Sequence, residues 1–116
     1  MVLRKYSERL AEFDMLTKRL LLSFRSQDDQ EIIANIHCLS GLKLSFSYIE
    51  SDLFFHYFSC CGYLKKPDFI VFALLIQNGV TISGEARALF SKLYLENKSF
   101  MDINDDVFQI TKVINR

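Results

Sequence analysis

The side chains best suited to chemistry are three cysteines and two histidines, found as the pair His37–Cys38 and as the group His56, Cys60 and Cys61. A zinc site needs four ligands at a recognisable spacing such as C-x-x-C, and neither group supplies this pattern. A helix would place His56 and Cys60 on one face, but they are only two ligands. On a helix Cys38 points away from His37, so the imidazole is not placed to activate the thiol. We expect neither a metal nor a catalytic cysteine.

The acidic residues and the glycines also do not match the sequence patterns of calcium-binding or phosphate-binding sites. Asp102, Asp105 and Asp106 lack the glycine and the distal glutamate of a calcium-binding loop, and helix capping explains them. Gly79 and Gly84 bracket four residues without a phosphate-binding glycine pattern and without a following lysine. We therefore predict no cofactor and no enzymatic activity.

Charge and composition narrow the class of partner. Fourteen basic and fourteen acidic residues cancel, so net charge offers no footprint for nucleic acid or for an anionic membrane. An odd number of cysteines, two of them adjacent, argues against a secreted disulfide framework and favours the cytoplasm. The first residues lack a signal peptide, and the most apolar stretch, residues 69–76, is too short to cross a bilayer.

The first segment predicts a long amphipathic helix that ends near residues 25–26. Charged residues occupy the positions between the apolar ones, as expected of a helix with one buried stripe. The apolar residues recur at spacings of three and four and are Leu3, Tyr6, Leu10, Phe13, Leu16, Leu20 and Phe24.

A second helix is predicted directly afterwards. Asp28 and Glu31 have the spacing of a capping box, and isoleucine and leucine follow at helical intervals up to Leu39. Gly41 stands where a helix end favours a left-handed residue, and Leu42 could make the accompanying apolar contact.

Residues 42–63 allow two interpretations. Residues 42–48 alternate between apolar and polar, which is a strand pattern, and a β-hairpin would turn at residues 51–52. Ser47 and Glu50 have capping-box spacing, however, and the apolar residues from Phe46 to Cys61 keep helical intervals before Gly62. Helix is preferred here, with a β-hairpin at residues 42–60 as the alternative.

The second half of the sequence shows clearer signals for where helices begin and end. Pro67 and Asp68 suit the start of a helix over residues 69–76 that ends at Asn78 and Gly79. Either Thr81 or Ser83 can then cap a helix that fades at Asn97, and Asp102 can cap a last one. We therefore predict a single all-α domain over residues 1–116: a long N-terminal helix followed by two helical hairpins and a closing helix. The alternative is α+β.

The helices after the first recur with a period near forty, close to that of stacked helical hairpins. Pro67–Ile76 followed by Gly84–Phe90 resembles a pentatricopeptide repeat, and Ala86–Phe100, with Tyr94 and Phe100, resembles a tetratricopeptide (TPR) hairpin. The resemblance implies a TPR-like fold whose concave surface holds a peptide or a partner helix. Small TPR-like chaperones of bacterial secretion systems have a similar size. The long RNA-binding arrays of pentatricopeptide proteins do not match this short, neutral chain.

A helix-turn-helix is the competing interpretation of residues 68–97. Gly79 would lie in the turn, and Arg87, Lys92 and Lys98 would belong to or follow the second helix. The connection between the two helices is longer than in a usual helix-turn-helix. Two glutamates also reduce the net positive charge of the second helix. A small DNA-binding transcriptional regulator is thus the alternative function.

The leading hypothesis is a protein-binding helical module that acts as an adaptor, a chaperone of the secretion type, or an inhibitor. Its partner would be another protein, a peptide helix or a second copy of the chain, with no membrane and no nucleic acid involved. The residues predicted to face the partner are apolar or aromatic: Phe54, Tyr57, Phe72, Ile76, Phe90 and Tyr94.

Overall fold

The computed structural model describes residues 2–62, 65–95 and 105–115. Every regular element in these ranges is helical, and none of these residues lies in a β-strand. The all-α prediction is confirmed, and the β-hairpin at residues 42–60 is not supported. The elements are α1 (Val2–Ser26), α2 (Asp29–Ser40), the 3₁₀ turn η1 (Phe46–Tyr48), α3 (Leu53–Ser59), α4 (Phe69–Gln77), α5 (Gly84–Phe90), the π-helical turn η2 (Ser91–Leu95) and α7 (Asp105–Ile114).

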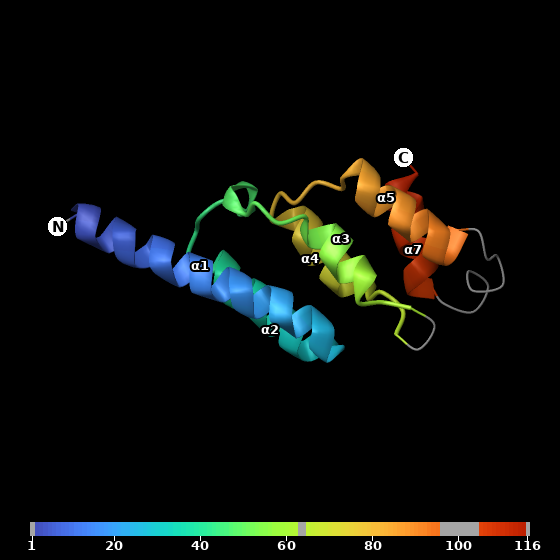
Figure 1. Ribbon diagram of the computed structural model, residues 1–116, viewed down its shortest axis with the longest axis horizontal. Coiled ribbons are helices and arrows are strands. Elements are labelled where there is room, and N and C mark those ends of the chain that lie inside the picture. Colours follow the sequence, from blue (N-terminus) through green and yellow to red (C-terminus); the bar gives the residue numbers. More distant parts are fainter. Residues whose placement is uncertain (1, 63–64, 96–104, 116) are drawn as a thin grey trace.

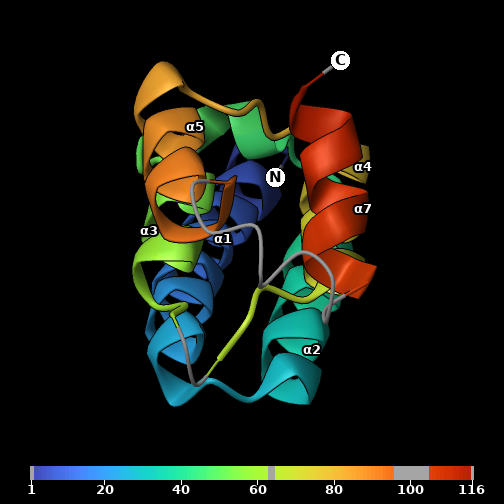
Figure 2. The same cartoon turned by 90° about the vertical axis from the view of Figure 1, so that its right-hand side faces the viewer.

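The helices are arranged in two layers (Figures 1 and 2). One layer contains α1, α3 and α5 in succession, and the other contains α2, α4 and α7. Within the layers α1 packs on α3, α3 on α5, α2 on α4, and α4 on α7, while α1 and α2 pack together across them. The strongest contacts between described helices thus join successive helices of one layer, or α1 and α2 across the layers.

The order of pairing differs from the one expected from sequence. We expected α1 to stand alone and α2 to form a hairpin with the helix after it. Instead α2 folds back on α1, because Gln27 takes a left-handed conformation (φ 60°) and Asp28 caps α2 at once. Such a short connection makes two helices antiparallel neighbours.

Four side chains start the helices by capping them. Asp28 accepts from the backbone N–H of Gln30 at 3.0 Å, and Asp68 caps α4 in the same way. Ser83 caps α5, as one of the two predicted alternatives. Asp52 caps α3, which was not predicted. Each cap satisfies an N–H group that the first helical turn leaves without a partner.

The predicted helix across residues 46–61 is interrupted. Phe46 opens a single 3₁₀ turn, the chain becomes extended at Ile49, and α3 begins only after Asp52. The capping box predicted at Ser47 is therefore wrong, and Cys61 lies beyond the end of α3. Burial accounts for the break, because Phe46 and Leu53 both reach the core on either side of it.

The helix ends predicted at Gly41 and Gly79 are both confirmed, since α2 ends at Ser40 and α4 at Gln77. Gly79 takes a positive φ of 87°. The left-handed conformation predicted at Gly41 is wrong. Gly41 has a right-handed φ of −63°, and the left-handed residue is Lys43 at φ 58°. The predicted end at Asn97 and the predicted cap Asp102 lie outside the described residues.

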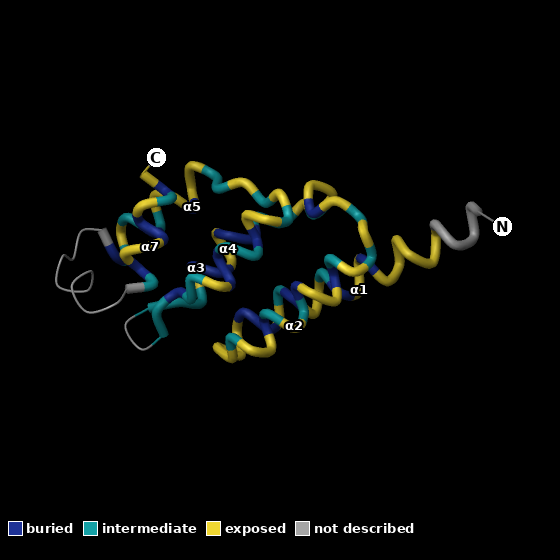
Figure 3. The backbone as a smooth tube through the Cα atoms, turned by 180° about the vertical axis from the view of Figure 1, so that it is seen from behind, coloured by how far each residue is buried: buried dark blue, intermediate teal, exposed yellow. Residues whose placement is uncertain are grey.

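Aromatic rings connect neighbouring helices within and between the layers through one core, whose buried residues are dark blue in Figure 3. Phe24 of α1 meets Tyr57 of α3 at a ring-centroid distance of 5.3 Å, and Phe54 of α3 meets Phe72 of α4 at 5.2 Å. Further along, Phe58 meets Phe90 at 5.2 Å. Such tilted ring pairs stabilise beyond the area that they bury.

Candidate functional site

The six side chains predicted to bind a partner differ in how far they are buried. Five of them, Phe54, Tyr57, Phe72, Phe90 and Tyr94, are at most 1% exposed and belong to the core of the chain itself. Ile76 is 38% exposed. Contact with a partner stays a prediction, and Ile76 is the residue of the six that is accessible for it. The other five pack in the core of the described conformation, although Phe72 also lines the groove described next.

Ile76 lies in an apolar groove between α4 and α7. Residues 69, 73 and 76 follow one another at helical intervals on α4, and Val113 faces them from α7. The cavity measures about 220 Å³ and is open to solvent. We call it the α4/α7 groove; its lining residues are Phe69, Phe72, Ala73, Ile76, Gln77 and Val113. None of them carries a charge.

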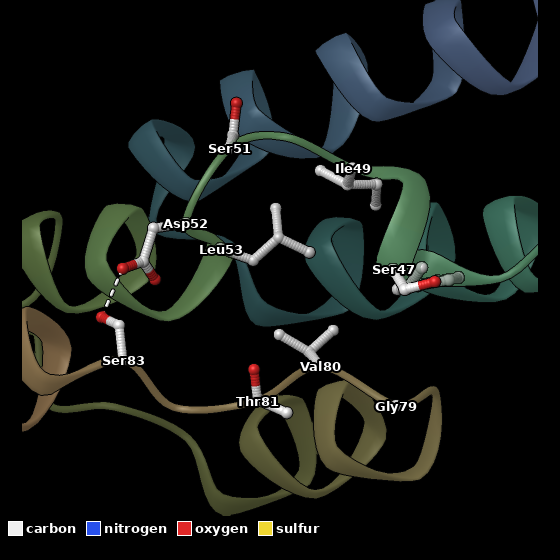
Figure 4. Close-up of a pocket in the computed structure, with 10 residues that line it drawn as sticks. Ser47, Ile49, Ser51, Asp52, Leu53, Gly79, Val80, Thr81 and Ser83 are labelled. Atoms are coloured by element: carbon white, nitrogen blue, oxygen red, sulfur yellow. Dashed lines mark hydrogen bonds between the residues drawn. The ribbon is translucent and has the colours of Figure 1, made fainter.

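A second cavity of about 290 Å³ lies between η1 and the loop after α4 (Figure 4). It is rich in hydroxyl groups, including those of Ser47, Ser51 and Thr81. The carboxylate of Asp52 is already occupied, because it accepts from the backbone N–H of Phe55 at 3.0 Å and from the hydroxyl of Ser83. Asp52 and Ser83 cap α3 and α5, so this cavity lies where the starts of these two helices meet.

A polar cluster lies where α3 ends near the start of α2. Asp29 and Lys65 form a mostly buried ion pair that joins α2 to the segment before α4. The hydroxyl of Tyr57 accepts from the backbone N–H of Asp68 at 2.7 Å, so it ties α3 to the cap of α4. The hydroxyl of Tyr94 is buried next to the Cys61 thiol, a weak hydrogen-bonding group, and makes no stronger hydrogen bond among the described residues.

Burial sets the protonation states in this cluster. It raises the pKa of the Cys61 thiol to about 12, with the Lys65 ammonium opposing the shift. It also raises the pKa values of Tyr57 and Tyr94 well above their ordinary range, and the Cys61 thiol adds to both shifts. All three groups are therefore neutral at physiological pH, and Cys61 is not a thiolate nucleophile.

The described parts of the chain contain neither a metal-binding cluster nor a membrane-spanning helix. Over residues 2–62, 65–95 and 105–115, no three His, Cys, Asp or Glu side chains lie close enough together to hold a metal ion. In the same ranges, no helix combines the length and the apolar character needed to cross a bilayer.

The segment considered as a helix-turn-helix is divided between the two layers. α4 packs on α2 and α7, while α5 packs on α3. The guanidinium of Arg87 donates to the backbone carbonyl of Ile114, so this predicted DNA contact is engaged within the chain.

Comparison with protein-family models, with curated proteins and with solved structures finds no match in any of the three. The α4/α7 groove is thus assigned from its own geometry. Of the lining residues, sequence spacing alone found Phe72 and Ile76. It missed Phe69, Ala73, Gln77 and Val113. An apolar residue at position 69 or 73 could have been included because it shares a helical face with Ile76.

Proposed function

We propose that this protein is a helical binding module whose α4/α7 groove receives the apolar side chains of a helix from another protein. The observation that carries the proposal is an exposed groove lined without charge, formed by two helices of the same layer. Adaptors, chaperones and inhibitors use such surfaces, and the TPR-like resemblance of the sequence supports the same class.

The size of the groove favours a peptide over a small molecule. At about 220 Å³ it is smaller than typical small-molecule sites, which begin at roughly 300 Å³. It has room for one or two apolar side chains, as when an amphipathic helix places its anchors three or four residues apart. Gln77 at the edge supplies an amide that can bond to a polar group of the incoming helix.

Site-specific photo-crosslinking tests this proposal in the native host. A benzophenone amino acid placed at position 76 should form a discrete crosslink to a partner protein, which mass spectrometry then identifies. Position 70 is the matched control, because Ile70 lies on the same helix, is 58% exposed and does not line the groove. The crosslink at position 76 should disappear in an Ala73→Asp background.

Two outcomes would count against the groove. Crosslinks of equal yield and identity at positions 70 and 76 would indicate nonspecific apolar contact. Retention of the crosslinked partner after Ala73→Asp would show that the partner does not occupy the groove.

A further inference from the structure

The N-terminal part of α1 extends beyond the rest of the fold. A helix rises about 1.5 Å per residue, so α1 with 25 residues is roughly twice as long as α2 with 12. Figures 1 and 3 show α1 continuing past α2 toward the N-terminus. Residues 7–12 are all exposed, and Leu10 among them is 40% exposed although it continues the apolar stripe of the core.

A groove lies beside the next turns of the same helix. It measures about 450 Å³ and is formed by residues 13–21 of α1 and residues 48–51. We call it the α1/η1 groove. Leu10 and Leu21 are eleven residues apart and thus share one face of α1, so the groove leads directly into the exposed part of the stripe.

The groove and the protruding segment have opposite charges. The groove contains Asp14 and Glu50 but only one basic residue, Lys18, which pairs with Asp14 at 3.2 Å. Residues 2–10 contain three basic residues and one acidic residue, and they also carry the apolar residues Leu3, Tyr6 and Leu10. Residues 2–10 thus combine apolar side chains with a net positive charge. This composition complements a groove that has both apolar and polar lining residues and more acidic than basic side chains. The guanidinium of Arg9 is already engaged with the backbone carbonyl of Leu42.

α1 cannot fill its own groove, because it is one continuous helix and its first turns lead away from residues 13–21. A second copy can. We propose that this protein forms a two-fold symmetric dimer in which the α1 helices run antiparallel and residues 2–10 of each copy cover the α1/η1 groove of the other.

Two-fold symmetry makes this contact reciprocal. The surface that is covered and the segment that covers it belong to the same helix, so one antiparallel alignment forms both contacts at once. A formal net charge of zero opposes association only weakly. The dimer leaves the α4/α7 groove uninvolved, since the two grooves share no lining residue. The dimer and the proposed function can therefore succeed or fail separately.

Sedimentation velocity of the full chain over a wide concentration range tests the dimer. The wild type should change from monomer to dimer as concentration rises. Leu10→Asp should weaken the dimer at least about tenfold, because it places a charge in the apolar contact. Leu22→Asp is the matched control and should leave the dimer unchanged, since Leu22 is 63% exposed on a different face of α1.

Charge reversal provides a second, independent measurement. Glu50→Lys and Lys5→Glu should each weaken the dimer, and the double variant should recover part of the loss. High salt should weaken the wild-type dimer for the same reason. Circular dichroism confirms that each variant remains helical.

A chain that stays monomeric at every concentration overturns the proposal. So does a dimer that tolerates Leu10→Asp, or one that Leu22→Asp weakens equally. Failure of the double charge reversal to restore association would exclude this antiparallel pairing.

Discussion

The hydroxyl of Ser83 donates a hydrogen bond to the carboxylate of Asp52, although the two residues are 31 positions apart. Each residue also caps its own helix: Asp52 accepts from Phe55 N–H, and Ser83 accepts from Ala86 N–H at 3.0 Å. One bond thus ties the starts of α3 and α5, which are neighbours in the same layer (Figure 4).

We expect the two caps to be energetically coupled. Ser83→Ala and Asp52→Ala should each lower the free energy of unfolding by about 1–2 kcal/mol, the usual cost of a lost helix cap. The double variant should lose about 0.5–1 kcal/mol less than the sum, because the bond between the two side chains can be lost only once. Urea denaturation of the four proteins measures the coupling.

Asp28→Ala provides the control for this cycle. Asp28 caps α2 and shares no hydrogen bond with Ser83. Its effect should add to that of Ser83→Ala within about 0.5 kcal/mol. Additivity between Asp52 and Ser83 as well would show that the connection between the caps contributes nothing.

Two buried tyrosines should respond in different ways to loss of their hydroxyl groups. Tyr57→Phe leaves the Asp68 N–H without its acceptor and should lower stability by about 1–2 kcal/mol. Tyr94→Phe removes a buried hydroxyl whose neighbour is the weakly bonding Cys61 thiol, and should change stability by less than about 0.5 kcal/mol. Thermal unfolding compares the two variants directly. An equal loss in both variants would mean that Tyr94 makes a stronger hydrogen bond in solution than its contact with Cys61.

Alkaline pH should destabilise the protein. Burial raises the pKa of Cys61 from 9.0 to about 12, so between these values the unfolded chain releases a proton that the folded chain retains. Stability is therefore fully present below about pH 9 and is lost as pH rises toward 12. The raised pKa values of Tyr57 and Tyr94 act in the same direction above their ordinary value of 10.0.

Urea denaturation at increasing pH, with matched cysteine variants, tests this linkage. Cys61→Ala should reduce the loss of stability above about pH 9. Cys38→Ala is the control, because Cys38 is exposed, and it should leave the pH dependence unchanged. A wild-type stability that stays constant from neutral pH to about pH 11 would contradict the expected burial of Cys61.

Core and groove positions should differ sharply in their cost of truncation. Phe54→Ala and Phe72→Ala each remove a ring from the contact between α3 and α4 and should cost about 3–5 kcal/mol. Ile76→Ala should change stability by less than about 1 kcal/mol, since this side chain is partly exposed. A loss at position 76 as large as that at position 72 would place Ile76 in the core and weaken the case for the groove.

Local sequence signals determined where most helices begin and end. The apolar spacing of α1 requires no information from the rest of the chain, and Asp28, Asp68 and Ser83 cap the helices directly after them. These features depend on hydrogen bonds and dihedral angles within a few residues. The all-α class follows from them, as does the end of α4 before Gly79.

Only the tertiary structure decided which apolar residues are buried and which helices are neighbours. Phe54 and Phe55 are adjacent phenylalanines, yet the first is 0% exposed and the second 39%, because only Phe54 faces the second layer. Spacing specifies a helical face but not what covers it. The break after η1 has the same origin, since Phe46 and Leu53 can both enter the core only if the chain extends between them. Burial is a property of the assembled helices, and for this reason five of the residues predicted to contact a partner are buried in this structure while Ile76 is accessible.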